Sequence, residues 1–135
     1  MATTRDQERA RHAYKCVGDV EEGERAEYKV LVNSLGAAVM RSGLSAALAF
    51  IERELDEKKP KAPAANTFFD HLGSAGIPGL KAAGKNVPKL VRELELDDYM
   101  LATREVLKLT IWFRRAVQAL FADEPSAKPS AGGAA

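Results

Sequence analysis

Apolar residues recur along most of this chain at intervals of three and four, the spacing of one face of an α-helix. One stripe lies between residues 28 and 39 and joins Tyr28, Leu31, Val32, Leu35, Ala38 and Val39. A longer stripe lies between residues 99 and 120 and joins Tyr99, Ala102, Val106, Leu109, Phe113, Ala116 and Leu120. The alternating pattern of a half-buried strand does not occur in the sequence. The pattern therefore predicts an all-α protein.

Two further helices are predicted near these stripes. The first runs from about Thr4 to Val20, and its apolar face holds Ala10, Ala13, Tyr14 and Val17. The other follows Gly43 and buries Leu44, Leu48, Ile51 and Leu55, with Ala47 and Phe50 beside them. Gly43 is expected to form a sharp corner before this helix, because glycine takes a positive φ at little cost. Ser42 or Ser45 is expected to cap the helix that follows the corner.

The chain between residues 56 and 96 is less regular. A short helix is predicted to begin at Asn66 or Thr67 and to end at Gly73, and a second is predicted to open at Pro88 after a glycine-rich loop. Asp97 or Asp98 is expected to cap the last helix. Together the segments predict one domain over residues 1–122, a compact bundle of about five to six helices. Residues 123–135 are small and polar, which predicts a disordered tail.

Composition narrows the class of protein. The chain has 135 residues, enough for one domain with a hydrophobic core. Its opening residues do not resemble a signal peptide, and no apolar run approaches the roughly 18 residues that a membrane-spanning helix needs. The single cysteine, Cys16, excludes an intrachain disulfide and fits a reducing compartment. We therefore expect a cytoplasmic protein without a membrane partner.

Residues that carry catalytic or metal-binding chemistry are few and scattered. The only histidines, His12 and His71, are far apart in the sequence, and Cys16 lies among apolar residues of the first helix. The segment GLKAAGKN, residues 79–86, matches the start of a phosphate-binding P-loop but ends in Asn where the motif needs Ser or Thr. No strand is predicted before it. We therefore predict no catalytic residue, no metal site, no cofactor and no small-molecule substrate.

Basic residues gather in two places although the net charge is only +1. No acidic residue interrupts residues 81–92, and the outer face of the last helix carries arginine and lysine around Ile111 and Gln118. The predicted nucleic-acid-binding residues are Lys81, Lys85, Lys89, Arg104, Lys108, Arg114 and Arg115. An equally open interpretation is that these side chains are only solvated. For Trp112, a place at the core is favoured over stacking on a base.

Three stretches resemble one family, the small helical subunit of the type III-B CRISPR effector, or Cmr complex. Residues 6–17, DQERARHAYKCV, resemble the family's opening helix in their Gln, Arg and Ala-Tyr residues. Residues 39–50, VMRSGLSAALAF, resemble its apolar run, its Asn-Gly-Leu corner and its Ala-Phe helix. Residues 99–121 resemble its last helix in an Ala-Thr-basic-Glu start and a Trp-x-Arg-Arg centre. Residues 56–96 take no part in the resemblance.

Two residues depart from the family pattern. Ser42 stands where the family usually has Asn, and Gly36 stands where proline is common. Both positions affect how the helices turn rather than any chemistry, so the expected fold is unchanged.

The resemblance implies a non-catalytic structural subunit of an RNA-guided antiviral effector. In that family, several copies stack head to tail along the guide–target duplex, while other subunits hold the crRNA and cleave the target. The implied partners are other Cmr subunits, neighbouring copies of the chain, and the crRNA–target RNA duplex, mainly its target strand. Two alternatives remain open: a helical protein–protein adaptor without nucleic-acid contact, and a small enzyme built around residues 79–86.

Overall fold

The structure is a computed structural model that describes residues 2–56, 58–81 and 84–121. These residues form six α-helices and three short 3-10 helices, and no strand occurs among them, so the all-α prediction is confirmed. The elements are α1 (Arg5–Gly18), η1 (Glu22–Glu24), α2 (Arg25–Ser42), α3 (Leu44–Glu52), η2 (Arg53–Leu55), α4 (Ala62–Gly73), η3 (Gly84–Asn86), α5 (Val87–Glu93) and α6 (Leu96–Leu120). The predicted tail lies outside the described residues.

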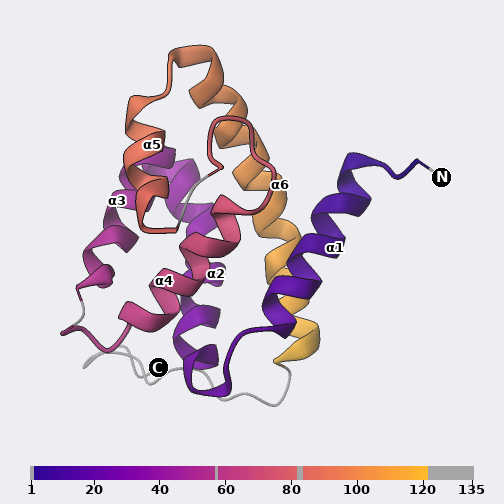
Figure 1. The fold of residues 1–135 in the computed structure, drawn as a ribbon, viewed down its shortest axis with the longest axis vertical. Coiled ribbons are helices and arrows are strands. Elements are labelled where there is room, and N and C mark those ends of the chain that lie inside the picture. Colours follow the sequence, from indigo (N-terminus) through magenta and orange to yellow (C-terminus); the bar gives the residue numbers. More distant parts are fainter. Residues whose placement is uncertain (1, 57, 82–83, 122–135) are drawn as a thin grey trace.

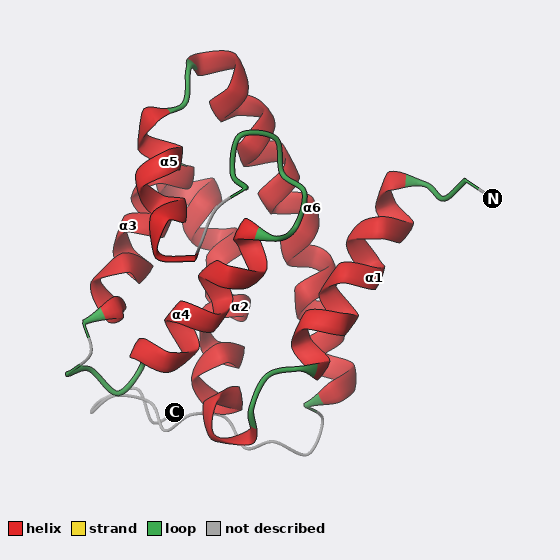
Figure 2. Ribbon diagram, viewed as in Figure 1, coloured by secondary structure: helices red, strands yellow, loops and turns green. Residues whose placement is uncertain are grey.

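Helix α2 is the central element of the bundle, since it packs against α3, α4 and α6. Helix α5 packs on α3 and α4, and η3 packs on α4. Helix α1 joins the bundle mainly through α6 and runs alongside it at the right of Figure 1. The described segments between the helices are loops and turns, among them a wide loop that follows α4 (Figure 2). This arrangement leaves one long side of α6 facing outward.

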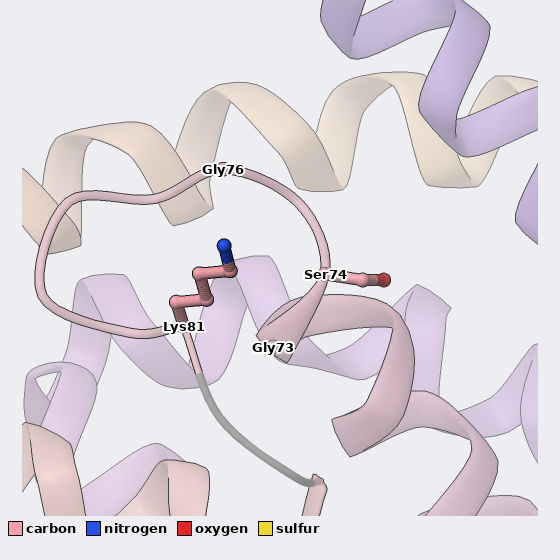
Figure 3. A pocket seen from close by; sticks show the side chains of 4 residues that line it. All are labelled: Gly73, Ser74, Gly76 and Lys81. Carbon is pink, nitrogen blue, oxygen red and sulfur yellow. The ribbon is translucent and has the colours of Figure 1, made fainter.

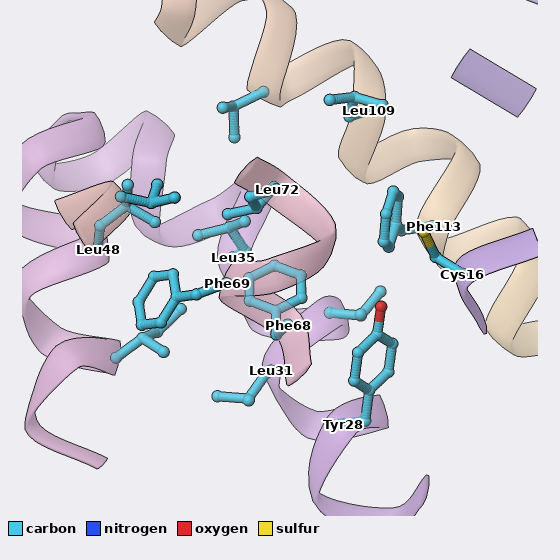
Figure 4. Close-up of a cluster of buried hydrophobic side chains, with 14 of the residues drawn as sticks. Cys16, Tyr28, Leu31, Leu35, Leu48, Phe68, Phe69, Leu72, Leu109 and Phe113 are labelled. Atoms are coloured by element: carbon cyan, nitrogen blue, oxygen red, sulfur yellow. The ribbon is translucent and has the colours of Figure 1, made fainter. Parts of the chain in front are cut away.

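The core forms where the predicted stripes of α2 and α6 meet α4 (Figure 4). Tyr28 and Phe68 lie edge to face with ring centroids 5.8 Å apart, and Phe68 meets Phe113 in the same way at 6.3 Å. Such pairs add about 0.5–1.5 kcal/mol each beyond the area that they bury. All six residues of the α2 stripe are buried or half-buried, as the spacing predicted.

Three apolar residues predicted to face the core lie at the surface instead. Phe50 is 67% exposed and carries the Arg53 guanidinium 5.5 Å above its ring, while Tyr14 is 40% exposed on the outer side of α1. Leu120 is also exposed, and Val117 and Phe121 are buried in its place. For Leu120 the reason lies in helix geometry: steps of 3 and 4 average 3.5 residues, so on a straight helix of 3.6 residues per turn the predicted seam drifts off the core toward the end of α6.

The corner between α2 and α3 has the predicted glycine but a different cap. Gly43 has φ +88° and ψ 162°, so the expected positive φ is confirmed. No side chain of the corner caps α3. Instead, the backbone N–H of Ser45 donates to the Tyr99 hydroxyl at 2.9 Å. The predicted serine cap is therefore wrong, because α6 brings a hydroxyl from a distant part of the chain to the exposed first turn.

The ends of the other helices were predicted with mixed success. Thr4 caps α1 and forms a reciprocal capping box with Gln7, which agrees with the predicted start. Helix α4 begins at Ala62 rather than at Asn66, because proline is well suited to a first helical turn and the alanines that follow favour helix. Neither Asp97 nor Asp98 caps α6. Both lie in its first turn, where a negative charge meets the positive end of the helix dipole.

Candidate nucleic-acid interface

All seven predicted basic residues are exposed, and the structure places them in two groups. The lysine group, on the segment from the α4–α5 loop into α5, consists of Lys81, Lys85 and Lys89. The α6 basic strip, on the outward side of α6, consists of Arg104, Lys108, Arg114 and Arg115. Among the described residues, none of the seven forms an ion pair with a carboxylate within 4.0 Å. Their charges are therefore available to an external anion.

The basic segment over residues 81–92 also contains Arg92, and this side chain is paired in the structure. Arg92 donates to Glu52 of α3 at 2.8 Å, and this hydrogen bond raises the pKa of the guanidinium. Spacing along the chain could not predict this pair, because Glu52 belongs to another helix. Arg92 therefore helps to join α5 to α3 and adds little free charge to the surface.

Lys81 lies in an open pocket of about 600 Å³ at the end of α4 (Figure 3). The pocket is lined by Gly73, Ser74, Gly76 and Lys81. The Ser74 hydroxyl donates a hydrogen bond to the backbone carbonyl of Asp70 in α4 at 3.0 Å, so its proton is already used within the protein. The carboxyl end of a helix carries partial negative charge, which favours a cation and disfavours an anion. The charge of Lys81 can therefore stabilise the carboxyl end of α4, in addition to any contact with phosphate.

The near match to a P-loop is a turn held by a carboxylate. The backbone N–H of Gly84 donates to Asp70 Oδ1 at 2.8 Å, and a β-carbon at position 84 would collide with the same carboxylate. A P-loop instead turns such N–H groups toward phosphate. No strand precedes this turn among the described residues, and residues 82–83 lie outside them. The geometry therefore argues against a nucleotide site here.

Trp112 lies at the edge of the core, where α1 meets α6. Its indole N–H donates to Asp6 Oδ1 at 3.0 Å, and the side chain is half-buried against the hydrophobic core. The Arg115 guanidinium carbon lies 5.1 Å from the centroid of the ring. The favoured core position is thus only partly right, because the ring also supports a basic side chain of the surface.

An ion-pair cluster fixes α1 against α6 behind the basic strip. Arg9 holds both carboxylate oxygens of Glu105, with its shortest contact at 2.9 Å, and Arg5 lies 3.3 Å from the same carboxylate. Burial pushes the pKa of Glu105 up, but hydrogen bonds and positive charge from Arg9 and Arg5 outweigh burial and hold this pKa below its usual value. Sequence reasoning missed the cluster, because Arg9 and Glu105 stand 96 positions apart.

The two histidines, distant in sequence, meet in the interior. The His12 Nε2 atom lies 2.8 Å from the His71 carbonyl oxygen, and His71 Nδ1 lies 2.7 Å from the Tyr28 hydroxyl. Burial, with a smaller contribution from the charge of His12, lowers the pKa of His71 to about 4. Burial also raises the pKa of the Cys16 thiol, 3.5 Å from His12, to about 11. At neutral pH the His71 ring and the thiol are uncharged, and an uncharged thiol is a poor nucleophile.

The geometry thus combines a hydrogen-bonded interior with free positive charge outside. Among the described residues, no three His, Cys, Asp or Glu side chains are arranged to hold a metal ion. The helices of those same residues include none that is both long and apolar enough to span a bilayer.

Comparison with known proteins identifies the family. The chain belongs to the Cmr5 family of CRISPR-associated proteins, whose family model matches residues 5–120. It is 36% identical over 118 residues to the CRISPR system Cmr subunit Cmr5 of Thermus thermophilus, a match that covers 87% of this chain and 96% of the relative. The matched range includes residues 56–96, which carried no recognisable part of the resemblance in the sequence.

A solved structure agrees with this assignment. The crystal structure of a CRISPR-associated Cmr5 family protein, also from Thermus thermophilus, superposes with a TM-score of 0.67 at 33% identity. The superposition covers 87% of this chain and 98% of the other. The resemblance predicted from the three short stretches is therefore confirmed at the level of family and fold.

Proposed function

We propose that this chain is a non-catalytic small subunit of a type III-B CRISPR (Cmr) effector that acts in the cytoplasm in antiviral defence. Several copies stack along the guide–target duplex beside the other Cmr subunits and help to bind target RNA. The observation that carries the proposal is the family match over residues 5–120. The exposed basic residues support the RNA contact, since none has a carboxylate partner among the described residues.

In the proposed mechanism, affinity for RNA and sequence specificity come from different contacts. Arginine and lysine of the lysine group and the α6 basic strip contact phosphates, which carry no sequence information. Pairing with the guide reads the sequence, as in other guide-directed effectors. The subunit needs no cofactor and no small-molecule substrate for this role. Because the net charge is only +1, affinity of the isolated chain for RNA is low and the assembled complex supplies the rest.

Large apolar side chains at the surface support the assembly part of the proposal. Five of them expose more than half of their area: Met40, Phe50, Leu96, Met100 and Ile111. Leu96 and Met100 stand four positions apart on the first turns of α6, so they lie on the same side of that helix. Apolar groups of this kind favour contact with another protein surface when they are contiguous.

The alternative function is a helical protein–protein adaptor without RNA contact. Under that alternative the basic residues are only solvated, and binding of the chain to its partners depends little on salt. Phosphate contacts instead make RNA affinity fall steeply with salt, by a log–log slope of about 0.7 per contacted phosphate on a single strand.

Charge reversal in the assembled complex tests the proposal. Arg114→Glu with Arg115→Glu, and separately Lys81→Glu with Lys85→Glu, should each weaken target RNA binding and flatten its salt dependence. The matched control is Arg11→Glu with Lys15→Glu, which changes the net charge equally on the exposed side of α1. Unchanged target affinity in both test variants would show that these residues do not contribute to RNA binding. A loss equal to that of the control would show only a long-range effect of net charge.

A further inference from the structure

The outer side of α6 carries a small pocket at the carboxyl-terminal end of the basic strip. The pocket has a volume of about 200 Å³ and is lined by Ile111, Arg114, Arg115 and Gln118. These residues follow one another at helical spacing, so they form one continuous surface of α6. Ile111 is 51% exposed in the middle of this polar surface. An isoleucine side chain cannot bind phosphate, but it can pack against the face of an apolar group.

One wall of the pocket is held in place from behind. The Arg115 guanidinium lies over the Trp112 ring, at 5.1 Å from its centroid. The indole is held in turn by its hydrogen bond to Asp6 of α1 at 3.0 Å. This chain of contacts restricts the long arginine side chain before any ligand arrives, which reduces the entropy lost on binding. The guanidinium thus offers its outer face as a planar, positively charged platform.

The lining suits a nucleobase better than a phosphate alone. Unstacked bases in RNA–protein complexes stack on aromatic rings or on guanidinium planes, and their edges form hydrogen bonds with side-chain amides. Here Arg115 supplies the plane, Ile111 an apolar contact, and the Gln118 amide both a donor and an acceptor. Arg114 remains for the adjoining phosphate. Among the described residues, none that lines the pocket carries a carboxylate that would repel the strand.

We propose that this pocket binds one unpaired nucleobase of an RNA strand, stacked on Arg115 and supported by Trp112. The inference rests on the proposed function, since the basic strip must first lie against RNA. It adds a contact to the base, which phosphate binding does not require. A base inside a duplex is stacked on its neighbours, so the pocket selects strands with an unstacked nucleotide.

The single tryptophan of the chain makes the test direct. The purified full-length protein is titrated at low salt with a single-stranded RNA of about 12 nucleotides and with an abasic strand of the same length. Tryptophan fluorescence reports the environment of Trp112, and anisotropy of labelled RNA reports affinity. We expect the strand with bases to bind about five- to tenfold more tightly than the abasic strand and to change the emission of Trp112.

Two variants separate stacking from charge. Arg115→Lys keeps the charge and removes the plane, so it should abolish most of the preference for the strand with bases. Arg104→Lys makes the same change on the same strip outside the pocket and should preserve that preference. Thermal unfolding of both variants confirms that they are folded.

The outcomes distinguish this inference from the proposed function. Equal affinity for the two strands with unchanged emission would overturn the base pocket while phosphate binding stands. An equal loss of preference in both lysine variants would also overturn it. Because the isolated chain is expected to bind RNA weakly, the titration is carried to high protein concentration at low salt. Failure of both strands to bind even there would overturn direct RNA binding by this chain, and the base pocket with it.

Discussion

The hydroxyl of Tyr99 accepts a hydrogen bond from the backbone N–H of Ser45 at 2.9 Å, across 54 positions of sequence. Tyr99 stands near the start of α6, and Ser45 stands in the first turn of α3. The first N–H groups of a helix have no partner within it, so the tyrosine does what a capping side chain would do. The long helix that carries the basic strip is thereby joined to the corner between α2 and α3.

Replacement of Tyr99 by phenylalanine should therefore destabilise the protein. Tyr99→Phe leaves the ring in place and removes only the acceptor, which should lower the free energy of unfolding by about 1–2 kcal/mol. Urea denaturation measures the change. Tyr14→Phe is the control, because Tyr14 is 40% exposed and its hydroxyl has no hydrogen-bond partner among the described residues. Equal stability of the two variants would mean that the Tyr99 hydroxyl does not cap α3.

The glycine of the corner should not tolerate a side chain. Gly43 combines φ +88° with ψ 162°, a region that is essentially restricted to glycine, and a β-carbon there would lie 3.4 Å from the Tyr99 hydroxyl. Gly43→Ala should cost about 1–3 kcal/mol. Gly23→Ala is the matched control, since a β-carbon at that position meets nothing within 4 Å. A drop in melting temperature no larger than that of the control would contradict the corner geometry.

The ion pair between Arg9 and Glu105 should matter more than the one between Arg92 and Glu52. The Glu105 side chain is 8% exposed and that of Glu52 is 33% exposed, so solvent screens the second pair more. Glu105→Gln leaves two arginines facing a neutral group and should cost about 1–3 kcal/mol. Glu52→Gln should cost less than about 1 kcal/mol. Denaturant midpoints measure both. A larger loss for Glu52→Gln than for Glu105→Gln would contradict this ranking of the two ion pairs.

Mild acid should destabilise the protein through His71. Its pKa is lowered to about 4 in the folded chain from an ordinary 6.5, mainly by burial. Between these values the unfolded chain binds a proton that the folded chain excludes, so this stability is complete above about pH 6.5 and is lost as the pH falls toward 4.

Urea denaturation between about pH 7 and pH 5 measures this effect, because carboxylates titrate mostly below that range. In the His71→Gln variant the fall in unfolding free energy should be smaller. If the wild type and the variant have the same pH slope, His71 is not the group responsible.

How well the sequence predicted a feature depends on whether that feature is set within one helix or by contacts with other elements. The α2 stripe from Tyr28 to Val39 depends on periodicity within one helix and was predicted residue by residue. The side chain of Phe50 looked like a core residue by the same reasoning, yet it is 67% exposed, because none of the described elements covers that side of α3. Periodicity shows that a helix has an apolar face but not how wide a face its neighbours cover.

The contacts that shape the candidate site are long-range, and spacing cannot show them. The pairs Asp6–Trp112 and Arg9–Glu105 join residues 106 and 96 positions apart, and both depend on α1 lying beside α6. Exposure of the seven basic residues was predicted correctly, because charged side chains are rarely buried without a partner. Their role in RNA binding stays a prediction, as does the extent of the single domain over residues 1–122.

The central claim is that this Cmr5 family chain works inside an RNA-guided effector. The most direct measurement is affinity purification of the tagged full-length protein from its own cells, with identification of the co-purifying proteins by mass spectrometry and of the RNA by sequencing. We predict recovery of several other Cmr subunits together with a short crRNA. Recovery of the chain alone, or with unrelated proteins and no RNA, would contradict the claim and favour the adaptor.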